Sequence, residues 1–116
     1  MKRVWLCALA LLLLSGCAAA PPSAEPRELR LDAPRPAVMT AALELFTDRG
    51  YVALGGDARL GRLEFVRGDV RLRLDARRAG EGSRVDLRGW RHGRALAPHE
   101  LDPLLVELEA ELGLLP

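Results

Sequence analysis

Cysteine is scarce in this chain of 116 residues, and its two copies, Cys7 and Cys17, both lie near the N-terminus. Residues 18–116 therefore contain no thiol that could form a disulfide, hold a metal ion or act as a nucleophile. Any domain in this part of the chain must be stabilised by its core alone.

Lysine is nearly absent, because Lys2 is its only copy and arginine supplies the other positive charges. Beyond residue 16 the chain has 15 Arg against 16 Asp and Glu, a net charge of −1. Residues 49–94 hold twelve Arg and six acids, whereas residues 95–116 hold five acids and no Arg. Such an imbalance can steer a charged partner toward one part of a protein.

The sequence has no apolar run long enough to span a bilayer. Its longest run, residues 4–14, has eleven residues and follows Lys2 and Arg3, whereas a transmembrane helix needs about twenty apolar residues. A run of this length after a positive start is typical of a secretory signal peptide.

Leu14-Ser15-Gly16-Cys17 follows directly and resembles the lipobox of bacterial lipoproteins at all four positions. The resemblance implies that residues 1–16 are a lipoprotein signal peptide and that Cys17 is lipidated after cleavage. Stable anchoring takes two or more acyl chains, because a single chain binds a bilayer only marginally. The alternative is an ordinary secretory signal that contains a cysteine. Because Ala18 replaces the Asp associated with inner-membrane retention, the resemblance implies the outer membrane, facing the periplasm.

Removal of residues 1–16 leaves 100 residues, enough for one small domain. Residues 17–35 begin with the lipidated Cys and are rich in Pro and Ala, so we expect an extended tether there. Within it, the alternation of residues 28–32 favours a short edge strand. Residues 36–116 are expected to form a small α+β domain.

Two amphipathic segments predict helices. The first covers residues 36–49, ends before Gly50, and has an apolar face formed by Val38, Ala41, Ala42, Leu45 and Phe46. The second is expected to open with Asp102 as N-cap and Pro103 in the first turn, and to end at Gly113.

Four strands are predicted between the helices. Residues 51–54 form the first, and Gly55, Gly56 and Asp57 are expected to turn the chain after it. Residues 62–66 and 69–77 are expected to form a hairpin with Arg67 and Gly68 in its loop.

The hairpin register predicts which charges face one another. It pairs Phe65 with Val70 and places Glu64 opposite Arg71. Residues 84–91 form the fourth strand after a loop at Glu81 and Gly82, which pairs Arg77 with Asp86 and Asp75 with Arg88.

The predicted fold class is α+β: a two-layer sandwich in the order helix–four antiparallel strands–helix, with both helices on one face of the sheet. The other sheet face is expected to be open and polar. The succession of a helix, Gly50-Tyr51, a strand, Asp57-Ala58-Arg59-Leu60-Gly61 and a hairpin resembles small BamC-like two-layer envelope lipoprotein domains over residues 36–112. This resemblance supports the fold rather than an activity.

The open sheet face is the candidate binding surface. It is expected to carry Arg62, Arg73, Arg88 and Trp90, and the predicted register leaves Arg62 and Arg73 without an acidic partner. Arginine binds phosphate and carboxylate through a forked geometry and stacks on aromatic rings. The face therefore suits an anionic envelope ligand, such as a lipid head group, lipopolysaccharide or peptidoglycan. The alternative is a solvated face whose charges are largely paired.

No catalytic or metal-binding pattern is present in the sequence. Its hydroxyl groups lie outside nucleophile motifs, and His92 and His99 are too few for a metal site even with Glu100 and Asp102. We expect no enzyme, no cofactor and no nucleic-acid partner. The predicted function is that of a membrane-anchored lipoprotein of the cell envelope, a non-enzymatic interaction or assembly accessory, with anionic ligand binding as the alternative.

The lipobox generates a direct prediction. Cys17→Ser removes the thiol that receives the lipid, so metabolic labelling with a palmitate analogue is expected to fall to background. Cys7→Ser is the matched control and should leave labelling intact, because Cys7 lies in the apolar run of the signal. Equal labelling of the Cys17→Ser variant and the natural protein would refute lipidation at Cys17.

Overall fold

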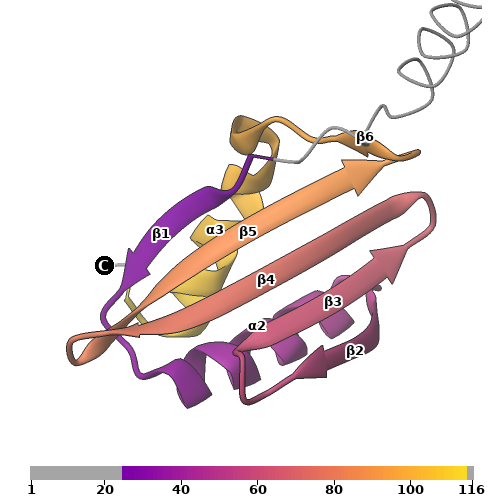
Figure 1. Ribbon diagram of the computed structural model, residues 1–116. Coiled ribbons are helices and arrows are strands. Elements are labelled where there is room, and N and C mark those ends of the chain that lie inside the picture. The colour runs from indigo at the N-terminus through magenta and orange to yellow at the C-terminus, as the bar shows by residue number, and fades with distance from the viewer. Residues whose placement is uncertain (1–24, 115–116) are drawn as a thin grey trace, which may run out of the picture.

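The computed structural model describes residues 25–114, so the lipobox and Cys17 lie outside the described part. Eight elements follow one another within these residues (Figure 1): β1 (Arg27–Leu31), α2 (Arg35–Asp48), β2 (Val52–Asp57), β3 (Arg62–Arg67), β4 (Val70–Ala79), β5 (Gly82–Arg91), β6 (Arg94–Ala95) and α3 (Pro98–Glu111). The strands form one antiparallel sheet in the order β1-β5-β4-β3-β2, and β6 pairs with β5. The predicted α+β class is confirmed, but the sheet has six strands rather than four.

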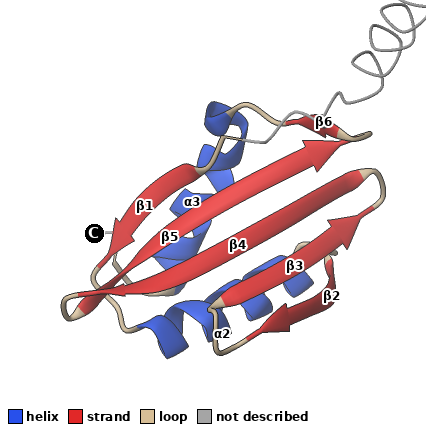
Figure 2. Ribbon diagram, viewed as in Figure 1, coloured by secondary structure: helices blue, strands red, loops and turns tan. Residues whose placement is uncertain are grey.

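Both helices lie behind the sheet in the view of Figure 2. The ring of Phe46 in α2 meets the ring of Phe65 in β3 edge-on, with centroids 4.8 Å apart. On α3, Leu101 lies so close to Gly89 that a Cβ at Gly89 would be 3.0 Å from the leucine side chain. Phe65, Leu72 and Gly89 are neighbours across β3, β4 and β5. No helix within residues 25–114 is long and apolar enough to cross a membrane.

The core lies between the helices and the sheet. All five residues of the predicted apolar face of the first helix are buried, which confirms that prediction. They pack with buried side chains of the strands and of α3, including Leu31, Phe65, Leu72, Leu74, Val85, Leu87, Leu101 and Leu108.

Both helices end at the predicted glycines. After α2, Gly50 has φ +88°, its N–H donates to the Thr47 carbonyl, and the Tyr51 N–H donates to the Phe46 carbonyl. Gly113 ends α3 in the same way at φ +72°. This pair of bonds satisfies carbonyls that the last helical turn leaves free, and glycine adopts the required left-handed conformation at low cost.

The predicted start of the second helix is wrong. The helix begins at Pro98 rather than after Asp102, because Glu100 Oε2 accepts the N–H of Ala97 at 2.8 Å and completes the first turn. Pro103 lies inside the helix. Asp102 does not cap the helix and instead pairs with Nε of Arg27 at 2.6 Å, which joins α3 to β1.

The turn predicted at Gly55, Gly56 and Asp57 is also wrong, because all three residues belong to β2. The strand has a register shift between Ala53 and Gly55, so the chain bulges there and still pairs with β3. A Cβ at Gly56 would lie 2.5 Å from the Arg62 carbonyl oxygen. Glycine is needed here for the close approach of two backbones, and residues 58–61 make the turn instead.

The β3–β4 register differs from the prediction by two residues. The loop consists of Gly68 and Asp69, not Arg67 and Gly68, and Gly68 has φ +57°. A positive φ at the first loop position favours glycine there. Phe65 consequently pairs with Leu72 rather than Val70.

The β4–β5 register is displaced in the same way. Its loop is Gly80 and Glu81, so Asp75 stands opposite Asp86 and Arg77 opposite Arg84. A shift of two residues leaves each side chain on its predicted face, since the side-chain period of a strand is two. It changes every charge pair.

The short strand expected at residues 28–32 is present as β1, at the edge of the sheet beside β5. The buried Ser83 hydroxyl donates to the Ala33 carbonyl at 2.7 Å and fixes the chain between β1 and α2. The folded part therefore begins by Arg27, within the range 17–35 expected to form the tether.

Candidate functional site

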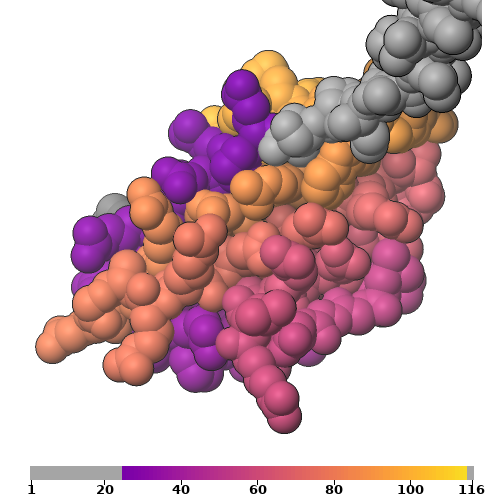
Figure 3. All heavy atoms as spheres, viewed as in Figure 1, coloured from indigo at the N-terminus to yellow at the C-terminus, as the bar shows by residue number. Residues whose placement is uncertain are grey.

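The sheet face opposite the helices is open, and its charges lie in rows that cross the strands. The register gives a row of cations, a row dominated by acids, a second row rich in arginine and a row with one arginine among apolar residues. In order, these rows are Arg30-Arg84-Arg77, Glu28-Asp86-Asp75-Arg62-Asp57, Arg88-Arg73-Glu64 and Trp90-Arg71-Val66-Val52. We call these residues the open face, and Figure 3 views the molecule from this side.

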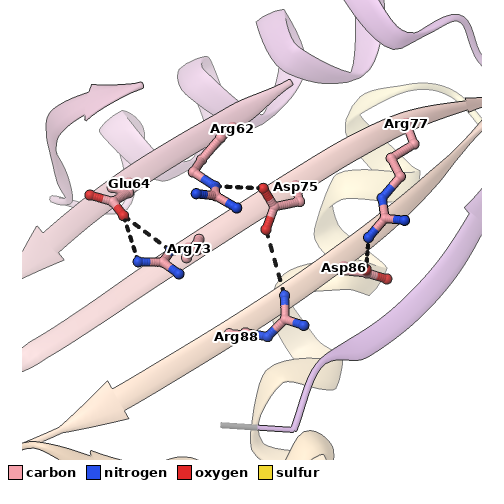
Figure 4. Close-up of polar contacts among 7 residues, drawn as sticks. All are labelled: Arg62, Glu64, Arg73, Asp75, Arg77, Asp86 and Arg88. Carbon is pink, nitrogen blue, oxygen red and sulfur yellow. Dashed lines mark hydrogen bonds and ion pairs between the residues drawn. The ribbon is translucent and has the colours of Figure 1, made fainter. Parts of the chain in front are cut away.

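Ion pairs connect the first three rows (Figure 4). Asp75 bridges two arginines, with its Oδ1 2.8 Å from Nε of Arg62 and its Oδ2 3.5 Å from Nη1 of Arg88. Glu64 Oε1 lies 3.0 Å from both Nε and Nη2 of Arg73. The hydrogen bond to Asp75 raises the pKa of Arg62 above its usual value, so the guanidinium group of Arg62 stays charged.

Two further pairs hold the far end of the open face. Arg77 Nη2 lies 3.5 Å from Asp86 Oδ2, and Arg84 Nη2 lies 3.3 Å from Glu28 Oε2. Asp86 is buried between Asp75 and Glu28, and its Oδ1 has no hydrogen-bond partner among the described residues. Like charges directly opposite destabilise a sheet, so the surrounding arginines are needed to hold this acidic row together.

The prediction that Arg62 and Arg73 are unpaired is wrong, because the two-residue shift brings Asp75 opposite Arg62 and Glu64 opposite Arg73. Arg88 does contact Asp75, and Arg77 contacts Asp86, but as diagonal rather than direct neighbours. The predicted pairing of Glu64 with Arg71 is also wrong, because Glu64 stands opposite Arg73 and forms an ion pair with it.

The last row borders a pocket of about 440 Å³, a volume within the usual range of ligand sites. Its walls come from β3, β4, β5 and the two loops at this end of the sheet: Val66, Gly68, Asp69, Val70, Arg71, Arg73, Trp90 and Gly93. A Cβ at Gly68 or Gly93 would meet no atom within 4 Å, so the pocket is open beside these two loop residues.

Two arginines and one tryptophan give this pocket its positive charge and its aromatic surface. The Arg73 guanidinium carbon lies 5.7 Å from the centroid of the Trp90 ring, a cation–π distance. Arg71 is exposed and forms no ion pair or side-chain hydrogen bond with any residue between 25 and 114. Its direct neighbours are Val66 and Trp90, so neither can neutralise it.

The loops at the rim are held to each other. His92 Nε2 lies 2.7 Å from Asp69 Oδ2, and the His92 N–H donates to the Asp69 carbonyl at 3.2 Å. This contact joins the β3–β4 loop to the β5–β6 loop and directs the Asp69 carboxylate toward His92.

Of the predicted site residues, Arg73 and Trp90 line the pocket, whereas Arg62 and Arg88 hold Asp75 farther along the sheet. The predicted register placed Arg71 opposite Glu64, so the sequence did not reveal Arg71 as an arginine without an acidic neighbour. The correct hairpin loop, with Gly68 in first position, would have revealed it.

Two hydroxyl groups of the described residues donate to backbone carbonyls. Ser83 donates to Ala33, and the Thr47 hydroxyl donates to the Leu43 carbonyl at 2.6 Å. Ser23 lies outside the described residues. Within residues 25–114, no three His, Cys, Asp or Glu side chains are grouped to hold a metal ion.

No protein-family profile matches the chain, and no curated protein matches it either. Inferences about its function therefore rest on its own residues.

The bridging carboxylate predicts a stability effect. Asp75→Asn removes the charge shared by Arg62 and Arg88 and is expected to lower the free energy of unfolding by about 1–3 kcal/mol. Glu81→Gln in the β4–β5 loop is the matched control and should change stability little, because Glu81 is exposed and no described residue pairs with it. Urea denaturation measures both, and equal stability of the two variants would contradict the bridging role.

Proposed function

We propose that this protein is a lipid-anchored lipoprotein of the bacterial cell envelope, at the outer membrane and facing the periplasm. Its domain acts as a non-enzymatic binding module: a two-layer sandwich of the BamC-like kind, with both helices on one face of the sheet and the other face presented to a partner. The lipobox at Leu14-Ser15-Gly16-Cys17 supports the anchor. The open face supports the binding role.

Arg71 is the observation that carries the binding proposal. The other arginines of the central strands on the open face have an acidic partner, whereas Arg71 has none among the described residues. It stands in a pocket beside Trp90, so a ligand that enters meets an aromatic ring and a guanidinium with all its donors free. An anionic group fits this combination, because arginine forms forked, charge-assisted hydrogen bonds to phosphate and carboxylate.

The charge balance of the open face points the same way. Its rows contain seven Arg and five Asp or Glu, a surplus of two positive charges. The two arginines without an ion pair to a described residue are Arg71 in the row at the pocket and Arg30 in the row at the far end. Only Arg71 has an aromatic neighbour and a pocket beside it.

Charge reversal at the pocket tests this function. Arg71→Glu is expected to weaken binding to anionic envelope material by about ten-fold or more, since hydrogen bonds to a charged group contribute about 1.5–3 kcal/mol. Arg30→Glu makes the same charge change at the far end and should bind like the natural protein. Binding is measured by sedimentation with anionic vesicles, lipopolysaccharide and peptidoglycan at low and high salt. Absence of salt-sensitive binding to all three would sink the proposal.

A protein partner is the second candidate, favoured by the exposed edge of β2. Val52 and Leu54 are 62% and 51% exposed on this strand, and within the described part of the chain its outer edge pairs with no strand. An unpaired edge can accept a strand from another protein. This surface suits an assembly accessory.

The edge predicts a specific crosslink. A photo-crosslinking residue at Leu54 should capture a defined envelope protein in intact cells. The same residue at Leu43, an exposed leucine of α2, should not. Identical crosslinking patterns at the two positions would count against the edge as a partner site.

A further inference from the structure

The tether joins the domain at about the middle of β5, slightly nearer to the end of the sheet that carries the pocket than to the far end. β1 is antiparallel to β5, and its first residue, Arg27, stands opposite Leu87. From Leu87, β5 continues past the start of β1 (Figure 1) through Trp90 to its last residue, Arg91. At about 3.3 Å per residue, Trp90 lies only about 10 Å beyond the level of Arg27 along the strand direction.

The distance between this end and Cys17 is bounded by the chain itself. Ten peptide steps separate Cys17 from Arg27, and a fully extended chain spans at most about 3.6 Å per residue, so the reach is at most about 36 Å. A lipid on Cys17 thus keeps the start of β1 within this distance of the bilayer, and the pocket lies within reach of the same surface.

We propose that the pocket holds the phosphate head group of an anionic phospholipid in the same leaflet that carries the anchor. This inference rests on the proposed lipidation of Cys17 and gives the binding module a definite ligand. The domain then makes two contacts with one membrane, one through its acyl chains and one through Arg71 and Trp90.

The pocket has donors available for a phosphate. Arg73 uses Nε and Nη2 for Glu64 Oε1, which leaves its Nη1 free of any described partner, and Arg71 has its full set of donors. A phosphate oxygen between these two guanidinium groups can accept from both, as in other arginine–phosphate sites. The carboxylate in the wall, Asp69, is held by His92 at 2.7 Å.

The composition of the rows matches an approach to the bilayer from this end. The row at the pocket contains Trp90, Val66 and Val52 beside Arg71, whereas the next three rows consist of ionic residues. Tryptophan and arginine are favoured at the level of lipid head groups, because their apolar parts contact the lipid and their polar ends contact water or head groups. Rows of paired charges suit the aqueous side.

The acidic helix α3 disfavours the opposite orientation. Glu100, Glu107, Glu109 and Glu111 belong to it, and the residues from 95 onward contain no arginine. An anionic surface repels this helix, so the domain is not expected to approach the bilayer through its helix layer.

The two contacts reinforce each other. A single head group binds weakly, but an anchored domain meets the head groups of its own leaflet at a high effective concentration. Because the attraction is electrostatic, it should weaken as salt is added.

Trp90 provides a direct measurement, since Trp5 lies in the signal and Trp90 is the only tryptophan after residue 16. The lipidated protein, purified from membranes, is reconstituted into vesicles of phosphatidylcholine alone or with added phosphatidylglycerol, using brominated acyl chains as quenchers. We expect a blue shift and quenching of Trp90 emission that require phosphatidylglycerol and disappear at high salt. Soluble glycerol phosphate in excess should partly reverse both, whereas free inorganic phosphate acting as the true ligand would reverse them fully at low concentration and overturn the lipid assignment.

Variants locate the site. Arg71→Gln should reduce the phosphatidylglycerol-dependent part of the quenching at least about five-fold, and Arg30→Gln, at the far end of the same face, should leave it unchanged. Thermal unfolding of both variants confirms that they are folded, and Arg71→Lys, which keeps the charge, should restore part of the signal.

Two failures are distinguishable. If the protein stays on the vesicles but Trp90 emission is the same with and without phosphatidylglycerol, the head-group site is refuted while the anchor and the binding module stand. If the natural protein does not remain with the vesicles at all, the proposed lipid anchor itself is refuted.

Discussion

The register of β3, β4 and β5 governs the chemistry of the open face. Two-residue loops at Gly68–Asp69 and Gly80–Glu81 set this register, and each strand then presents its even or odd residues to the helices. Apolar packing fixes the face on which a side chain lies, but the loops fix its neighbour. As a result, Asp75 forms ion pairs with two arginines and Glu64 forms one with Arg73. Arg71 forms none with any described acid.

The packing of the molecule could be read largely from the sequence. The buried face of the first helix, both helix ends and the apolar alternation of the strands are strong signals, because each depends on periodicity or on a glycine with a positive φ. The two loops were not predictable in the same way. Arg67-Gly68 and Gly68-Asp69 both fit a two-residue turn, and a shift of two residues buries side chains on the same face. Nothing in the hydrophobic pattern separates these registers.

The same ambiguity in register limited which residues of the candidate site could be predicted. Arg73 and Trp90 could be placed on the open face by parity alone, and both line the pocket. Arg71 could not be recognised, because its lack of a partner follows from the register and not from parity. Similarly, Pro103 inside a helix and Gly55 and Gly56 inside a strand contradict local propensities. Pro103 lies in the second turn of α3, after a first turn closed by Glu100, and the two glycines accompany a bulge of β2.

If Cys17 is lipidated as proposed, the position of β1 also determines how the domain resists a pull on its anchor. A pull on the tether along the strand direction loads the backbone hydrogen bonds between β1 and β5 together, in shear, and Arg27 passes part of the force to α3 through Asp102. If β1 detached, its five residues would lengthen the tether by about 16 Å.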